Sequence, residues 1–151
     1  MKIDVNGVSI TLTQEQLEEI AKQTKLSKFL SYKDIKMYND ACLLLNISNA
    51  IPDFASLNGF DSTKIKRHVA LFKLENIAKA IRSFTQWKPD WNNANQYKYQ
   101  IRFNLKGGCS CYVNSYVTDS SVPSALALGT YEEAVHFGIE FLDLFKDLYT
   151  E

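Results

Sequence analysis

The sequence predicts an α+β domain built on a small antiparallel sheet. Residues 97–105 alternate strictly between apolar and polar side chains, which is typical of a strand with one buried face. Gly107 begins a glycine pair that readily takes the backbone angles of a tight turn, so a central hairpin is expected at about 97–117. Two amphipathic helices, at about 63–84 and 130–149, are expected to pack on this hairpin.

A two-residue turn fixes the predicted register of the hairpin. In that register Phe103 faces Tyr112 and Tyr99 faces Tyr116, so one face would be aromatic. Such cross-strand pairs stabilise a sheet by roughly 0.2–1 kcal/mol each. The opposite face would carry a more polar set of side chains: Lys98, Gln100, Arg102, Asn104, Cys111 and Val113.

The N-terminal residues predict a second β-hairpin followed by a helix. An Asn-Gly pair, the strongest two-residue turn signal, separates two short alternating segments within residues 2–12. Thr13 and Gln16 then have the spacing of a capping box, in which two side chains bond the free amides at a helix start. The helix that follows is expected over about 14–23.

Similar local signals mark the middle and the end of the chain. Apolar residues at helical spacing predict a short helix from about Met37, and Pro, Gly, Asn and Ser residues predict a loop over 46–60. Asp61 can cap the long central helix, and Thr130 begins a second capping box. The short apolar segment 124–128 is a candidate third strand of the sheet.

The composition indicates one domain, because the chain has 151 residues and 46% of them are hydrophobic. Residues 1–23 are expected to form an attachment that could be partly independent of it. No apolar run approaches about 18 residues, so no membrane span is expected, and the first residues do not resemble a signal peptide. Three cysteines without a disulfide spacing favour a reducing cytoplasm.

The formal charge is zero overall but uneven along the chain. Residues 61–106 carry ten basic and three acidic residues, a net charge of +7, and residues 107–151 carry one lysine and seven acids, a net of −6. Two interpretations stay open. The two parts neutralise each other across the fold, or the basic segment presents a surface to an anionic partner, nucleic acid included.

The candidate binding residues gather around the segment WKPDW at 87–91. Its proline and its Asx-type turn former predict a loop. The two tryptophans either plug the core or form a contact surface, since tryptophan is prominent among residues that dominate binding energy. With the neighbouring basic residues, the candidates are Lys79, Arg82, Trp87, Lys88, Asp90, Trp91, Lys98 and Arg102.

No catalytic or metal motif stands out in the sequence. Glu132, His136 and Glu140 are spaced along one helix, but three such groups reach one metal only with strain. Cys109 and Cys111 form one half of a zinc knuckle without the other half. The glycine-rich phosphate loops, the nucleophile elbow and the zinc-binding helix motif do not occur. We therefore expect no enzyme activity, no metal and no cofactor.

Several segments carry a resemblance to other proteins. They are the opening NGVSITLTQEQLEEIAKQ, YNDAC at 38–42, LENIAKA at 74–80 followed by WKPDWNNANQYKY at 87–99, and the last helix from Glu133. They resemble a loose group of small uncharacterised proteins of Bacteroidetes bacteria and their phages. The chain departs from that group at 100–102 and at 125–128. The resemblance implies a phage or mobile-element accessory protein and carries no known activity.

Three hypotheses about function follow. The first is a non-catalytic phage or mobile-element protein that binds and inhibits a host protein or ribonucleoprotein, such as a defence nuclease, in the cytoplasm. The second is a pocket that sequesters a small anionic ligand such as a nucleotide, with aromatics stacking the base and Arg102, Lys98 or Arg82 holding phosphate. The third is a structural or virion-associated protein. The sequence leaves the oligomeric state open.

Overall fold

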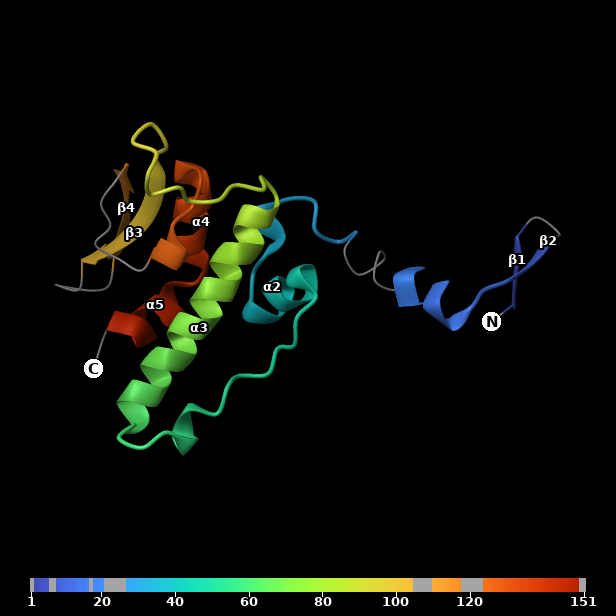
Figure 1. Ribbon diagram of the computed structural model, residues 1–151, viewed down its shortest axis with the longest axis horizontal. Helices are drawn as coiled ribbons and strands as arrows, with labels where there is room; N and C mark the ends of the chain where they lie inside the picture. Colours follow the sequence, from blue (N-terminus) through green and yellow to red (C-terminus); the bar gives the residue numbers. More distant parts are fainter. Residues whose placement is uncertain are drawn as a thin grey trace. The chain divides into compact units, whose positions relative to one another are not determined.

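The chain divides into two compact units, residues 1–30 and 31–151, and each is described by itself. The second unit combines helices with an antiparallel pair of strands, which confirms the predicted α+β class. The computed structural model shown in Figure 1 describes residues 2–5, 8–16, 18–20, 27–104, 110–117 and 124–149.

The first unit contains the N-terminal hairpin. Strands β1 (Lys2–Val5) and β2 (Val8–Thr11) pair in the antiparallel direction, with Ile3 opposite Ile10. This pairing register is the one that a two-residue Asn-Gly turn requires, although the turn itself lies outside the described residues.

A helix follows the hairpin, and residues 14–16 and 18–20 belong to it. The amide of Thr13 donates to Gln16 Oε1 at 3.0 Å, and the amide of Gln16 donates to Thr13 Oγ1 at 3.2 Å. These two hydrogen bonds form the predicted capping box. The box was predictable from sequence because it involves only residues three apart. The predicted end of this helix, residues 21–23, lies outside the described residues.

The second unit is built around one long helix, α3 (Ser62–Ser83). The side chain of Asp61 accepts a hydrogen bond from the amide of Lys64 at 2.8 Å and caps the helix as predicted. Helices α2 (Tyr38–Leu45) and α5 (Leu142–Tyr149) pack against α3 (Figure 1). Its fully buried residues are Ala70, Leu74, Ile77, Ala78, Ala80 and Ile81.

The central hairpin is present, but its predicted register is wrong by one residue. Strands β3 (Lys98–Asn104) and β4 (Ser110–Tyr116) pair so that Ile101 lies opposite Val113. Val113 therefore shares the face of Ile101 and packs against the core, while Tyr112 lies on the other face and is half exposed. Burial of the branched apolar side chain decided the register, rather than the shortest turn.

The start of β3 is covered on both faces, which corrects a second expectation. Lys98 and Gln100 were predicted on the more polar face of the hairpin, yet both are fully buried. The strand pattern identified the alternation correctly but could not reveal that another segment of the chain covers the polar side.

The candidate third strand, residues 124–128, contributes only one bridge to the sheet. A short 3₁₀ turn, η3 (Ser124–Leu126), comes first. Leu128 and Tyr99 then exchange two backbone hydrogen bonds of 2.9 Å each. Leu128 is fully buried, so this segment serves the core as well as the sheet edge.

The predicted last helix is in fact two helices. Helix α4 (Tyr131–Glu140) begins with the expected capping box between Thr130 and Glu133. Phe141 then leaves the helical conformation, with φ −110° and ψ 26°, and α5 follows. Because α4 packs on β3 and β4 while α5 packs on α3, the break lets neighbouring residues serve two different surfaces.

The core of the second unit is rich in aromatic rings. The Phe145 ring lies 4.7 Å from the Phe103 ring and 5.0 Å from the Phe137 ring, measured between centroids. These contacts join α4, α5 and the hairpin. Ring packing thus helps to hold the sheet to the helices.

The remaining connections are short turns and loops. A 3₁₀ turn, η1 (Tyr32–Asp34), precedes α2, and the loop over 46–60 contains one further turn, η2 (Phe54–Ser56). The loop is attached to the start of α3, where the Phe60 ring lies 4.6 Å from the His68 ring. Among the described residues, no helix is both long and apolar enough to cross a membrane.

Candidate ligand-binding cleft

The candidate site forms where α3 ends and the tryptophan-containing loop begins. Gln86 adopts a left-handed backbone conformation with φ 53°, which turns the chain away from the helix. The last turns of α3 and the residues after Gln86 then form two sides of a cleft of about 520 Å³. Its lining residues are Leu45, Lys79, Arg82, Ser83, Gln86, Trp87, Lys88 and Pro89.

Trp87 is held in place by close contact with Gly129. A Cβ atom added at Gly129 would lie 2.8 Å from Cγ of Trp87 and 3.1 Å from both Cδ1 and Cδ2. One face of the indole therefore lies on the Gly129 backbone, and only glycine leaves room for it. Trp87 is half-buried and contributes a fixed aromatic surface to the cleft.

Arg82 is also fixed, by residues far away in the sequence. Its Nη1 donates to the carbonyl oxygens of Ala125 at 2.7 Å and Ala127 at 2.8 Å. Burial lowers the pKa of Arg82, an effect opposed by the nearby carboxylates of Glu133 and Glu75. An arginine keeps its proton under such conditions, so the cleft holds a permanently charged and oriented guanidinium.

Glu133 supports the same region from below the surface. Its Oε2 accepts hydrogen bonds from the amides of Gly129 at 3.0 Å and Thr130 at 3.2 Å. Burial raises the pKa of the Glu133 carboxyl, while the Gly129 and Thr130 amides, the Thr85 hydroxyl and Arg82 act in the opposite direction. Glu133 thus anchors the backbone that carries both Gly129 and the carbonyls bonded by Arg82.

Lys79 and Lys88 complete the charge of the cleft. Both side chains are exposed, and no hydrogen bond or ion pair of either ammonium occurs within the described residues. With Arg82 they place three cationic side chains around one cleft, and none of its lining residues is acidic. The structure therefore brings together four of the eight predicted site residues: Lys79, Arg82, Trp87 and Lys88.

Lys98 is a predicted site residue that has a different role. Its ammonium is buried and donates to the carbonyl oxygens of Asn93 at 3.0 Å and Val117 at 2.7 Å. The same nitrogen lies 5.5 Å from the centroid of the Trp91 ring, within the range of a cation–π contact. Lys98 therefore fastens the loop to the hairpin and cannot present its charge to a phosphate in this conformation.

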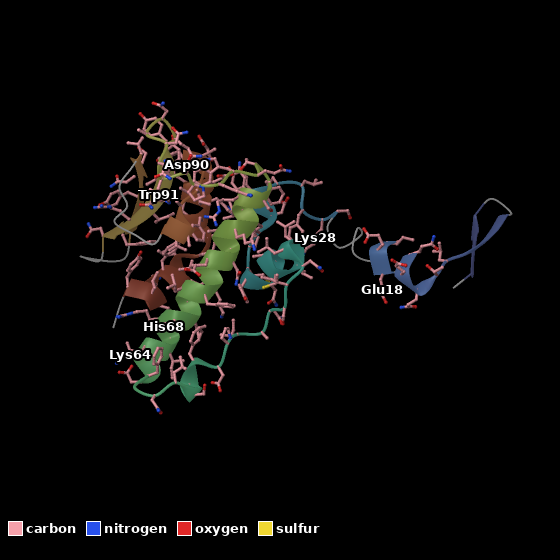
Figure 2. All side chains as sticks on the ribbon, in the orientation of Figure 1. Glu18, Lys28, Lys64, His68, Asp90 and Trp91 are labelled. Carbon is pink, nitrogen blue, oxygen red and sulfur yellow. The ribbon has the colours of Figure 1, made fainter. Side chains whose placement is uncertain are left out.

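Asp90 and Trp91 lie in the loop beside the hairpin rather than in the cleft (Figure 2). Asp90 Oδ1 accepts from the amide of Asn92 at 3.0 Å, the Asx-type turn expected from the sequence. Gln96, which the sequence did not single out, closes the loop. It donates from Nε2 to the Lys88 carbonyl at 2.9 Å and accepts at Oε1 from the Asp90 amide.

Arg102, the last predicted site residue, lies on β3 opposite Tyr112 and is half-buried. It does not line the cleft. The structure thus divides the predicted set into four cleft residues and four residues of the loop and hairpin. The sequence did not identify Gly129 and Gln86 as site residues. Their roles depend on backbone geometry, which cannot be inferred from the residue type alone.

The other candidate chemistry does not assemble into a site. His136 donates from Nε2 to the Ile35 carbonyl at 3.1 Å, and Glu140 pairs with Lys36 at 3.0 Å, so these side chains have structural partners. Within the described residues no group of three or more His, Cys, Asp or Glu side chains could hold a metal ion. Cys109 lies outside the described residues, and nothing is described of the Cys111 side chain.

No family model, no curated protein and no solved structure matches this chain.

Proposed function

We propose that this protein is a non-catalytic binding protein and that its contact surface is the cleft at the end of α3. In the host cytoplasm it would act as a phage or mobile-element accessory protein that binds and inhibits a host protein or ribonucleoprotein, such as a defence nuclease. The observation that carries the proposal is the gathering of Lys79, Arg82 and Lys88 around one cleft with no acidic residue in its lining.

A structural explanation for these cations is insufficient. Basic side chains near a helix C-terminus complement the partial negative charge of the helix dipole. That partial charge amounts to only about half an elementary charge, and the carboxylates of Glu133 and Glu75 act on Arg82. Lys79 and Lys88 still have no ion-pair partner within the described residues. Like charges held close together destabilise the free protein, and an anionic partner would remove this cost on binding.

The biological setting of the proposal is supported by the resemblance of the chain's segments to phage and mobile-element proteins. The mode of action is supported by the composition of the cleft, because it is lined by a tryptophan and an arginine, two residue types that are enriched at binding hot spots. Inhibition would follow if the cleft bound an anionic group that the host component needs for its activity.

The test is capture of host components from a lysate with tagged protein, with and without nuclease treatment. Three forms are compared: the unmodified chain, the double variant Lys79→Gln/Lys88→Gln, and the control Lys33→Gln. Lys33 is an exposed lysine outside the cleft, so the control removes surface charge without altering the proposed contact.

The expected result is one stoichiometric component that the unmodified chain and the control retain and that the double variant loses. Association should also weaken as salt is raised, since the contact is between opposite charges. Capture that is equal for all three forms would contradict the proposal, because the cleft would then play no part.

A further inference from the structure

We infer that the cleft binds a single phosphorylated nucleotide unit, with the phosphate on Arg82, Lys79 and Lys88 and the base against Trp87. This inference rests on the proposed function, because it assigns a ligand to the same cleft. The nucleotide could be free or could be the phosphorylated end of a nucleic acid strand, since both present the same group.

The arrangement of the cations favours phosphate over a single carboxylate. Arg82 uses Nη1 for Ala125 and Ala127, and its Nη2 and Nε have no acceptor within the described residues. A guanidinium fixed in this way is a preformed fork of donors for an oxyanion. Two further ammonium groups, of Lys79 and Lys88, balance a dianion better than a group with one negative charge.

The remaining lining favours a flat ring beside the phosphate. Gly129 supports one face of the Trp87 indole, so the ring is positioned before any ligand arrives. Leu45 and Pro89 add apolar surface, and both are half-buried. Nucleobases stack on aromatic side chains of this kind without strong sequence preference.

The size of the cleft favours one nucleotide unit rather than a continuous strand. A volume of about 520 Å³ falls within the range of about 300–1,000 Å³ that is usual for small-molecule sites. A strand would therefore enter by its end. This separates the inference from general binding of nucleic acid by the whole basic segment.

The test is a fluorescence titration of the full-length chain carrying Trp91→Phe, which leaves Trp87 as the only tryptophan. The probes are AMP, adenosine, ribose 5-phosphate, inorganic phosphate, and a short oligonucleotide with and without a 5′-phosphate. Calorimetric titration of the unmodified chain with AMP provides a measurement that does not depend on the Trp91 substitution.

We expect AMP to bind at least about tenfold more tightly than adenosine, ribose 5-phosphate or inorganic phosphate, because only AMP contacts both the cations and the indole. Lys79→Gln/Lys88→Gln should weaken AMP binding at least about tenfold, whereas Lys33→Gln should change it less than twofold. Tighter binding of AMP or of the 5′-phosphorylated strand identifies the source of the nucleotide, and either supports the inference.

Three outcomes would overturn it: no binding of AMP or of the phosphorylated strand, equal binding of AMP and inorganic phosphate, or AMP binding unchanged by the double variant. If host capture still depends on Lys79 and Lys88 in those cases, only the ligand assignment fails. If host capture is also independent of both lysines, the proposed function fails together with the ligand assignment.

Discussion

For Lys98, the sequence predicted the correct face of the strand but the wrong solvent exposure. A buried ammonium is costly unless its donors are satisfied. Here two carbonyl oxygens and the ring of Trp91 lie close to it, so the charge joins the 88–97 loop to the residue that follows β4. Alternation along β3 predicted the direction of the side chain, but the covering loop could not be predicted from the strand alone.

Replacing Lys98 by methionine tests this role. Lys98→Met keeps the length of the side chain but leaves the carbonyls of Asn93 and Val117 without their donor. We expect the free energy of unfolding to fall by about 1–3 kcal/mol, measured by urea denaturation. Lys88→Met, at an exposed position, should change it by less than about 0.5 kcal/mol. Equal effects of the two substitutions would refute the structural role of Lys98.

His136 leads to a prediction about pH. Burial lowers its pKa below the ordinary value of 6.5, and Lys36 and Lys33 add to this effect, while the Ile35 carbonyl and Glu140 oppose it. Between the folded pKa and 6.5, the unfolded chain binds a proton that the folded protein does not. The contribution of His136 to stability is therefore complete above 6.5 and is lost as the pH falls through this window.

The check is a series of urea midpoints between about pH 7 and pH 5. His136→Gln should show a shallower fall in stability over this range than the unmodified chain. The control His68→Gln retains His136 and should keep the steeper fall. Identical slopes for His136→Gln and the unmodified chain would show that His136 does not titrate as described.

At the scale of elements, signals that depend on near neighbours were reliable. The structure contains all three predicted caps, at Thr13, Asp61 and Thr130. They could be predicted because each involves residues only three apart. The break at Phe141 was not predictable in the same way. The apolar pattern continues through it, and the break separates α4, which packs on the hairpin, from α5, which packs on α3.

The aromatic contacts across that break should dominate the stability of the second unit. Phe145→Ala removes a ring that touches Phe103 and Phe137 and is 2% exposed. We expect a loss of about 3–5 kcal/mol in the free energy of unfolding, by urea denaturation. Ile139→Ala, on α4 but 64% exposed, should cost less than about 0.5 kcal/mol. A small loss of stability for Phe145→Ala would contradict the claim that these aromatic contacts dominate the stability of the second unit.

At the scale of the whole molecule, the division into residues 1–30 and 31–151 makes a prediction about folding. Every residue of the main hydrophobic core lies between Ile35 and Leu148. A chain of residues 31–151 should therefore unfold cooperatively, with a Tm within about 5 °C of the full-length protein by circular dichroism. Removal of α5, which supplies Phe145 and Leu148, should abolish cooperative unfolding. A large loss of Tm on removing residues 1–30 would contradict the prediction.

The cleft could be anticipated only in part, and the reason lies at this same scale. Lys79, Arg82, Trp87 and Lys88 are close in sequence, so composition and spacing pointed to them. The supports of Arg82 and Trp87 are Ala125, Ala127 and Gly129, about forty residues later. No local pattern connects these two stretches, and neither the glycine nor the two alanines carries a chemical signature of its role.

This mixed construction determines how the cleft could be moved to another protein. Seven of its eight lining residues lie between Lys79 and Pro89, which makes the segment look like a portable loop for grafting. A synthetic peptide of that segment would nevertheless leave Arg82 and Trp87 free to rotate. A functional graft must therefore include residues 125–129 as a second segment. The recognition groups lie in residues 79–89, but residues 125–129 hold Arg82 and Trp87 in position.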